Sequence, residues 1–417
     1  MNSTPTAYQD PVRPEVPLPR GAATGPSDVA AGPPDGTGEP RDVATDLRET
    51  RAEQVGSGPA LPERRGARSG DRLYVLDLLR FGAAMMVVGF HLVAPSEVWG
   101  ADTATLFTHT VTQFFRYGWI GVEFFFVISG FVICMSGWGR TLSEFFVSRV
   151  TRLMPMYVLA VLLTSAVVLL GPPPGNDLSV PQILANLTMV QSLLDQPSID
   201  TVYWTLFVEL KFYLLFAVVV AVGATYRRVL LFCAMWTVVA LFAQATETRL
   251  LQVLVEPLYA PYFVVGVTLY LIHRFGPSLL LWATLGMSAI LCAVSLTARV
   301  DGRQTHYAVA LALFSAFLLI MVAIALGWFS WLRWRGLVTI GLLTYPVYLL
   351  HQRIGQLVIR EFRDLGMAPW LLLGTIVIGV LLLAAALNVI YERPVARMLR
   401  DRLRADFARV RAEPTRR

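Results

Sequence analysis

Charge is scarce in this chain. Asp, Glu, Lys and Arg make up 15% of its 417 residues, whereas a soluble domain carries about a quarter. Lysine is nearly missing, since Lys211 is the single lysine and the other members of the Lys and Arg count are arginines. Hydrophobic residues account for 55% of the chain, and after about residue 75 no polar stretch is long enough to form a soluble domain. The composition therefore excludes an ordinary soluble enzyme.

Cysteine is also rare. Cys134, Cys233 and Cys292 all fall inside apolar blocks, which excludes a disulfide framework and favours their use as small apolar fillers. No two histidines have the spacing of metal ligands, so we expect no metal site. The net charge of +6 does not indicate nucleic-acid binding, because the arginines gather at the ends of apolar blocks and near the two chain ends, as the positive-inside bias requires.

Long apolar runs are what the chain has in abundance. Ten blocks of about twenty residues are each long enough to cross the ~30 Å hydrocarbon core of a bilayer as a helix. A segment in lipid must satisfy its own backbone hydrogen bonds, so each block is expected to be helical. We therefore predict an all-α polytopic membrane protein with about ten transmembrane helices. The blocks begin near Leu76, Gly118, Arg152, Tyr203, Tyr226, Pro257, Pro277, Tyr307, Gly336 and Pro369.

Three regions follow from the composition. Residues 1–71 are rich in Pro, Gly, Ala, Asp and Arg, cannot bury enough apolar surface to fold, and are predicted to form a disordered cytoplasmic tail. Residues 72–395 hold the ten-helix membrane domain, and residues 396–417 are predicted to form a basic cytoplasmic tail. The arginines beside both tails place the two chain ends on the cytoplasmic side. A short amphipathic stretch from Ile183 to Leu194 is expected at the membrane interface.

Ionisable residues inside a span are costly, so each is a candidate functional residue. The first span contains Asp77, Arg80 and His91. Arg80 and His91 are eleven residues apart, which is three turns plus roughly 20°, so they share one helix face and lie about 16 Å apart along the axis. Asp77 can pair with Arg80 one turn away. The competing interpretations are that Arg80 snorkels to the interface and that His91 is a hydrogen-bonded packing residue.

Three further ionisable side chains are expected at the depth of His91. Counting the helical rise from the start of each span places Glu123, Glu209 and His351 in the outer half of the membrane together with His91. A carboxylate and an imidazole at one level can act as a base and its orienting group.

Two other polar residues in the spans have simpler interpretations. No Gly-x-Ser-x-Gly sequence surrounds Ser129, so we expect Ser129 and Gly130 to serve close helix packing rather than nucleophilic catalysis. Lys211 follows Glu209 by two residues, so the two side chains point to different faces and are not an obvious ion pair. Each is expected to face an aqueous cavity or a separate partner.

A pair of arginines marks the start of the third span. Arg149 and Arg152 are three residues apart and share one helix face. Guanidinium groups bind phosphates through two parallel hydrogen bonds, so the pair favours a phosphorylated ligand. The competing interpretation is an anchor that contacts lipid head groups.

These features combine into a family resemblance. The segments that carry it are RLYVLDLLRFGAAMMVVGFH, GVEFFFVISGFVI, FFVSRVTRLMPMYVL, WTLFVELKFYLL, LTYPVYLLH and YERPVARMLR. Over almost all of residues 72 to 400 the chain resembles the acyltransferase 3 family of bacterial integral-membrane acyltransferases. The family's motif positions match Arg80 and His91, Arg149 and Arg152, and Trp204 and Glu209. Leu210 and Lys211 depart from the family pattern, so no role carries over to them.

The resemblance implies a multi-pass protein of the bacterial cytoplasmic (inner) membrane. It implies acyl-CoA, with acetyl-CoA expected, as a co-substrate on the cytoplasmic side, no permanently bound cofactor, and an acceptor hydroxyl reached from the outer side. As a hypothesis, Arg80, Arg149 and Arg152 hold the CoA phosphates. His91 then acts as the general base or carries the acyl group transiently, and Glu209 orients it or compensates its charge. The supporting residues are expected to be Asp77, Glu123, Trp204 and His351.

The acceptor stays open at this stage. A hydroxyl of a carbohydrate-containing molecule is expected, either a surface glycan or a lipid-linked sugar. A secreted natural-product glycoside such as a macrolide is an alternative. A transporter or flippase of a glycan precursor is an alternative of another class, but the sequence shows none of the internal repeats that transporters often have.

Overall fold

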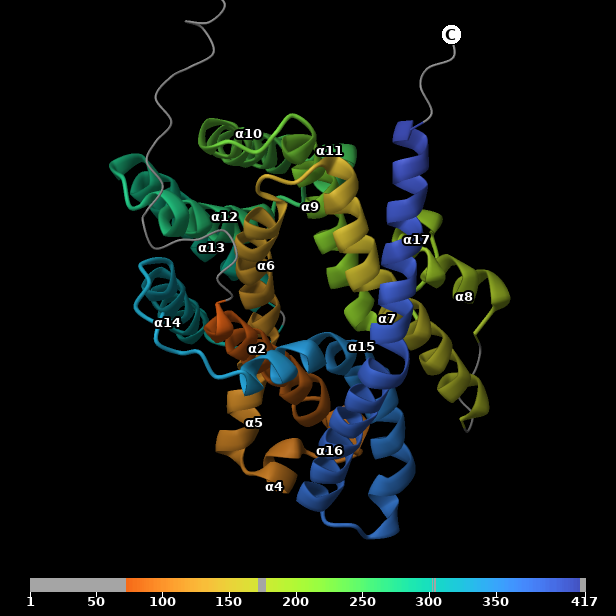
Figure 1. Ribbon diagram of the computed structural model, residues 1–417. Helices are drawn as coiled ribbons and strands as arrows, with labels where there is room; N and C mark the ends of the chain where they lie inside the picture. Colours follow the sequence, from red (N-terminus) through yellow and green to blue (C-terminus); the bar gives the residue numbers. More distant parts are fainter. Residues whose placement is uncertain (1–72, 172–177, 302, 304, 413–417) are drawn as a thin grey trace, which may run out of the picture. The chain divides into compact units, whose positions relative to one another are not determined.

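The computed structural model describes residues 73–171, 178–301, 303 and 305–412. The predicted tail at residues 1–71 lies outside these described residues. Within them the chain forms helices, turns and connecting segments, and no strand (Figure 1). The prediction of an all-α protein is confirmed.

Eleven long helices make up most of the described chain. They are α2 (Tyr74–Val93), α6 (Gly121–Gly137), α7 (Leu142–Leu170), α9 (Trp204–Ala221), α10 (Tyr226–Ala245), α12 (Ala260–Phe275), α13 (Leu279–Val300), α14 (Tyr307–Ala325), α15 (Gly336–Phe362), α16 (Pro369–Leu387) and α17 (Arg393–Ala412). The shorter helices are α3 (Ser96–Trp99), α4 (Thr103–Phe107), α5 (His109–Arg116), α8 (Val180–Leu187) and α11 (Arg249–Val255).

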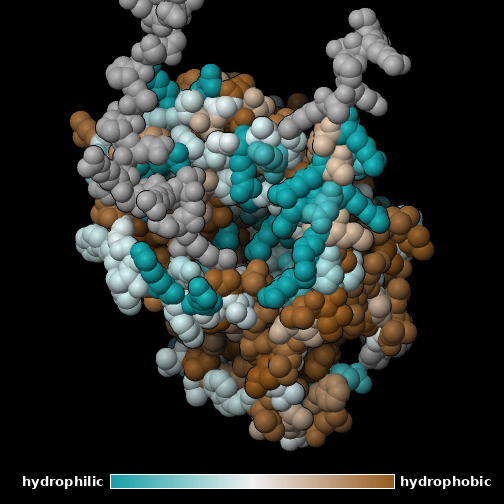
Figure 2. Space-filling view, in the orientation of Figure 1, coloured by the Kyte–Doolittle hydropathy of each residue, from teal (hydrophilic) through white to brown (hydrophobic). Residues whose placement is uncertain are grey.

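The helices are those of a multi-pass membrane protein. Nine segments of the described chain are long and apolar enough to cross a bilayer. The tenth predicted span corresponds to α15, which has 27 residues but carries His351, Gln352 and Arg353 in its middle, so its mean hydropathy is low. Figure 2 shows hydrophobic side chains over much of the lower part of one face, where lipid can contact them, and hydrophilic side chains along α17.

Glycine permits a close helix crossing in the core. α6 packs against α12, and a Cβ on Gly130 would lie 2.2 Å from the Phe263 carbonyl oxygen. A Cβ on Gly266 would lie 2.0 Å from the Val127 carbonyl oxygen, so neither position accepts a larger residue. The close approach predicted at Gly130 is confirmed, and it fixes the neighbouring Ser129 on α6.

A second close contact joins α2 to α15. The two helices pack side by side, and a Cβ on Gly341 would lie 2.5 Å from Oδ1 of Asp77. Asp77 is buried and sits against this glycine. Further along the same helix pair, His91 of α2 comes to lie opposite His351 of α15.

The connection between α7 and α9 is fastened to α15. Within the stretch predicted to lie at the interface, the chain forms α8 and a 3-10 turn, Gln191–Leu194. Just beyond it, Asp200 accepts hydrogen bonds from the backbone N–H groups of Val202 and Arg353, at 3.2 and 2.9 Å. The start of α9 is therefore tied to the turn of α15 that carries His351.

Candidate active site

Two histidines meet where α2 packs on α15. Nδ1 of His91 lies 3.0 Å from Nε2 of His351, and the ring centroids are 5.2 Å apart. His351 is fully buried, whereas His91 is partly exposed. The sequence placed both at one depth, and the structure brings them into direct contact.

The hydrogen bonds of His351 fix where the protons lie. Its Nδ1 is 2.8 Å from the carbonyl oxygen of Tyr348 and 3.3 Å from that of Val347. A carbonyl can only accept, so Nδ1 of His351 carries the hydrogen, and Nε2 of the neutral ring offers a lone pair to His91. His91 then donates from Nδ1, which leaves its own Nε2 unprotonated and available as a base.

The surroundings of the histidine pair hold it in place. The side-chain amide of Gln356 donates to the backbone carbonyl of His91 at 3.0 Å, so α15 grips α2 at this residue. The Phe90 ring meets the His91 ring edge-on, with centroids 5.1 Å apart. These contacts position the two imidazoles through neighbouring helices rather than through a flexible loop.

A cavity of about 940 Å³ opens between α2, α6, α7, α9, α15 and α17. Six arginines line it, and we call it the arginine cavity; they are Arg80, Arg140, Arg149, Arg152, Arg400 and Arg404. Two carboxylates, Glu144 and Glu209, share its wall. Away from most of the arginines, the wall includes Phe125, Thr205 and Tyr348. The cavity therefore joins a strongly basic region to a more apolar one.

Arg149 is held by several side chains in the cavity wall. Its guanidinium donates to the hydroxyls of Ser136 and Ser148 at 3.0 and 2.9 Å and lies 5.7 Å from the centroid of the Tyr213 ring. Its Nε is buried without an acceptor among the described residues. Arg80, Arg149 and Arg152 all line the cavity, as a common phosphate site would require.

Glu209 lies in the cavity wall rather than beside His91. Its Oε1 accepts from the hydroxyls of Ser129 and Tyr213, both at 2.6 Å. The neighbour of His91 in the structure is the imidazole of His351, and the expectation that Glu209 orients or charge-compensates His91 stays a prediction. Ser129, expected only to help packing, also takes part in this hydrogen-bond network.

Glu123 belongs to a separate cluster. Its fully buried carboxylate accepts from Nε of Arg299 at 2.8 Å. The Arg299 guanidinium lies 5.5 Å from the ring centroid of Trp204 and 5.4 Å from that of Tyr259. The predicted layer of four residues thus divides into the histidine pair, Glu209 in the cavity, and Glu123 with Trp204 beside Arg299.

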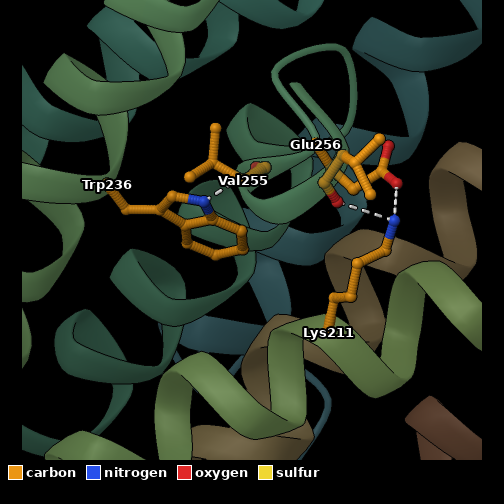
Figure 3. A network of polar contacts seen from close by, with 5 residues as sticks. Lys211, Trp236, Val255 and Glu256 are labelled. Carbon is orange, nitrogen blue, oxygen red and sulfur yellow. Dashed lines mark hydrogen bonds and ion pairs between the residues drawn. The ribbon is translucent and has the colours of Figure 1, made fainter. Parts of the chain in front are cut away.

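Lys211 also has its own partner. It forms an ion pair with Glu256 and donates to the Val253 carbonyl oxygen at 2.9 Å (Figure 3). The indole of Trp236 donates to the Val255 carbonyl oxygen in the same turn, at 2.9 Å. Glu209 and Lys211 therefore serve different faces of α9, as their spacing predicted.

Several residues of the site were not identified as candidates from the sequence. Tyr213 is four residues after Glu209, on the same helix face, and that spacing could have revealed it. Tyr348 is three residues before His351 on α15 and lines the cavity, but nothing in its surroundings in the sequence distinguishes it. Arg400 and Arg404 lie in the segment predicted to form a basic tail, residues 396–417; its described part belongs to the helix α17, which packs on α7.

Comparisons with known proteins agree with this architecture. Residues 73–389 match the family described as "Acyltransferase domain". The chain is also 35% identical over 111 residues to the exopolysaccharide production protein ExoZ of Rhizobium meliloti (strain 1021). That alignment covers 25% of this chain and 34% of ExoZ, so it spans about a third of the relative's length. No solved structure matches the chain.

The family match includes α2, α6, α7, α9 and α15, the helices that carry the histidine pair and most of the arginine cavity. It begins at residue 73, with the described chain, and ends at residue 389, before α17. Because this match extends over well more than half of the sequence, the protein belongs to the acyltransferase 3 family.

Proposed function

We propose that the protein transfers an acyl group, with acetyl expected, from acyl-CoA to a hydroxyl of a carbohydrate-containing acceptor. One observation carries the proposal: a cavity lined by six arginines ends within one helical turn of a histidine pair. Tyr348 lines the cavity, and His351 follows it by three residues, about 4.5 Å along the helix axis. A phosphate-binding region and a base are thus adjacent in one fold.

The arginine cavity fits a CoA thioester. Its volume of about 940 Å³ lies at the upper end of the range of ligand pockets, roughly 300–1,000 Å³, as an elongated nucleotide thioester needs. Guanidinium groups bind phosphates bidentately, and the buried Nε of Arg149 still offers an unused donor. The phosphates would lie among the arginines, and the thioester would extend toward Thr205 and Tyr348.

The histidine pair supplies the proton transfer. Nε2 of His91 removes the proton from the acceptor hydroxyl, and the oxygen attacks the thioester carbonyl carbon. The new C–O bond forms as the C–S bond breaks, and the departing sulfur takes the proton back from His91. During transfer, His351 accepts from Nδ1–H of His91 and stabilises the imidazolium, as the third member of a catalytic triad does.

His91 can also be written as a nucleophile. In that version Nε2 of His91 attacks the thioester carbon, the C–S bond breaks and CoA leaves as its thiolate. The acceptor hydroxyl then attacks the acyl-imidazole carbon and gives its proton to the thiolate, and the C–N bond breaks to restore His91. Rapid quenching of the protein with acyl-CoA in the absence of acceptor would distinguish the two. An acylated peptide containing His91 supports the covalent route, and its absence supports general-base catalysis.

The proposal of a carbohydrate acceptor rests on the similarity to ExoZ. ExoZ is named for exopolysaccharide production, which favours a surface glycan or its lipid-linked precursor; a secreted glycoside such as a macrolide is the alternative acceptor. The arginine placement favours the cytoplasmic side of a bacterial inner membrane for the donor. The acceptor would then approach His91, which is partly exposed, from the other side.

Labelled acyl-CoA tests the proposal directly. Membranes containing the protein, incubated with acetyl-CoA labelled in the acetyl group, should transfer label to glycan or glycoside, and mass spectrometry should show the added acetyl mass. Membranes without the protein provide the background. A flippase that only moves a glycan precursor would leave the label on CoA, and that result would contradict the proposal.

A further inference from the structure

The last described helix, α17, is built into the mouth of the arginine cavity. It follows a π-helical turn, Asn388–Glu392, in which the Asn388 amide donates to Glu392 at 2.6 Å and accepts from Arg393 at 2.9 Å. A π turn adds a residue to the helical repeat and so changes the direction of the helix that follows. The turn and α17 both pack on α7 (Figure 1).

One face of α17 lines the cavity. The residues on it are Arg400, Arg404, Phe407 and Ala408, whose spacing of four, seven and eight is that of a single helix stripe. The Phe407 ring meets the Phe146 ring of α7 edge-on, with centroids 6.2 Å apart. Arg402 is rotated by about 200° from Arg400 and points away from the cavity. Figure 2 shows hydrophilic side chains along α17.

The charges of the cavity identify what α17 contributes. Without α17, four arginines face two carboxylates, a surplus of two positive charges. With Arg400 and Arg404, six arginines face the same two carboxylates, a surplus of four. A CoA thioester carries about four negative charges, divided between its diphosphate and its 3′-phosphate, and the monoester supplies about half of them. The two arginines of α17 thus match the charge of one phosphate monoester.

We propose, as an extension of the proposed function, that Arg400 and Arg404 bind the 3′-phosphate of the acyl-CoA donor. The thioester must lie at the inner end beside Tyr348, so the nucleotide end stays at the mouth. Both arginines are exposed there, whereas Arg149 is enclosed deeper in the wall. α17 therefore selects free CoA thioesters over thioesters that lack the 3′-phosphate, including a phosphopantetheine arm carried on a protein.

Binding of two donor analogues tests this assignment. CoA and 3′-dephospho-CoA would be titrated into the full chain, purified in detergent, with isothermal titration calorimetry. The wild type should prefer CoA by about 10- to 100-fold, the range expected for lost charge-assisted hydrogen bonds. Arg400→Gln with Arg404→Gln should weaken CoA binding to the level of 3′-dephospho-CoA and leave the latter nearly unchanged. Arg402→Gln, on the opposite face, is the matched control.

A replacement of both arginines by lysine separates binding from folding. Lysine keeps the charge and loses the planar fork, so the preference for CoA should be partly retained. If the glutamine variant keeps the wild-type preference, the assignment to α17 is wrong while the proposed function stands. If the wild type binds neither analogue, the proposed function fails as well. If both analogues lose affinity equally in the glutamine variant, α17 acts only on the shape of the cavity, and the assignment is again wrong.

Discussion

His91 and His351 meet inside the contact between two helices, whereas the six arginines of the cavity come from three helices and one loop. Nδ1 of His91 and Nε2 of His351 are partners of each other, and the chain of hydrogen bonds ends on the carbonyls of Tyr348 and Val347. The arginines instead surround a space of about 940 Å³, and the positive charge of this space comes from all six of them.

This difference predicts two kinds of response to substitution. A chain of single hydrogen bonds fails when one member is lost, because the remaining groups have no alternative partner. A cluster of like charges around a flexible, highly charged ligand loses affinity in steps, since each phosphate can still reach other arginines. We therefore expect rate effects at the histidines to be large and binding effects at the arginines to be graded.

The largest effect is expected from His91→Ala. Removal of the base should lower kcat by about 10²- to 10⁴-fold, with CoA affinity nearly unchanged, because His91 is not among the residues that line the described cavity. Initial rates at saturating acetyl-CoA, together with calorimetric CoA binding, measure the two separately. His109→Ala, an exposed histidine of α5, is the control. A variant with full activity would overturn the mechanism.

His351→Ala should have the next largest effect. His91 would keep its position through Gln356 but lose the imidazole that fixes its tautomer and stabilises its protonated form. A loss of about 10²-fold or more in kcat is expected, smaller than that of His91→Ala. In the double variant, His351→Ala should add little to the loss in kcat caused by His91→Ala, because both substitutions disable the same catalytic unit. Gln352→Ala changes the next residue of α15 and serves as the control; additive losses would show that the two histidines act independently.

The first span shows how far the sequence could predict the site. Arg80 and His91 share one helix, so the regular rise and twist of that helix fixed their relation without any structure. His351 and Glu209 lie on other helices, and counting from a span boundary gives only their depth. Rotation about the helix axis is set by packing, here by Gly341 against Asp77, and that rotation placed His351 rather than Glu209 beside His91.

The packing of the C-terminal segment could not be predicted for a different reason. The prediction of a basic tail rested on the composition of residues 396–417, which are rich in charged side chains. Composition alone does not reveal which helix face makes a contact. The stripe of Arg400, Arg404, Phe407 and Ala408 was present in the sequence, but its partner surface on α7 was not visible there. The centre of α15 is polar because it carries His351 of the site, and this helix is therefore less apolar than the other spans.

Arg149→Gln tests the graded binding expected of the arginine cavity. Loss of this enclosed guanidinium should weaken CoA binding by about tenfold, while kcat at saturating donor stays within a few-fold of the wild type. The salt dependence of CoA binding should also become shallower, since one fewer charge contributes. Arg333→Gln, an exposed arginine outside the cavity, is the control. A loss in kcat as severe as that of His91→Ala would remove the distinction between the two regions.

The smallest effect is expected where the two regions join. The Tyr348 hydroxyl is 2.8 Å from Oγ1 of Thr205 in the cavity wall, and the Tyr348 ring lies 5.7 Å from the His351 ring. Tyr348→Phe keeps the ring and the carbonyl that binds His351 and removes only the hydroxyl. One hydrogen bond contributes about 0.5–1.5 kcal/mol, so kcat/KM should fall by roughly two- to tenfold.

A double-mutant cycle locates that small effect. Thr205→Val should reduce kcat/KM by a similar factor, and the double variant should lose less than the sum of the two, because both remove the contact they share, although each hydroxyl also lies within hydrogen-bond distance of the Val202 carbonyl. Tyr345→Phe removes a hydroxyl that instead donates to the Leu153 carbonyl, at 3.1 Å, and should not couple to Thr205. Full additivity of Tyr348→Phe and Thr205→Val would mean that the cavity and the histidine pair are joined by packing alone, and the hydroxyl contact would then have no role in passing the thioester to His91.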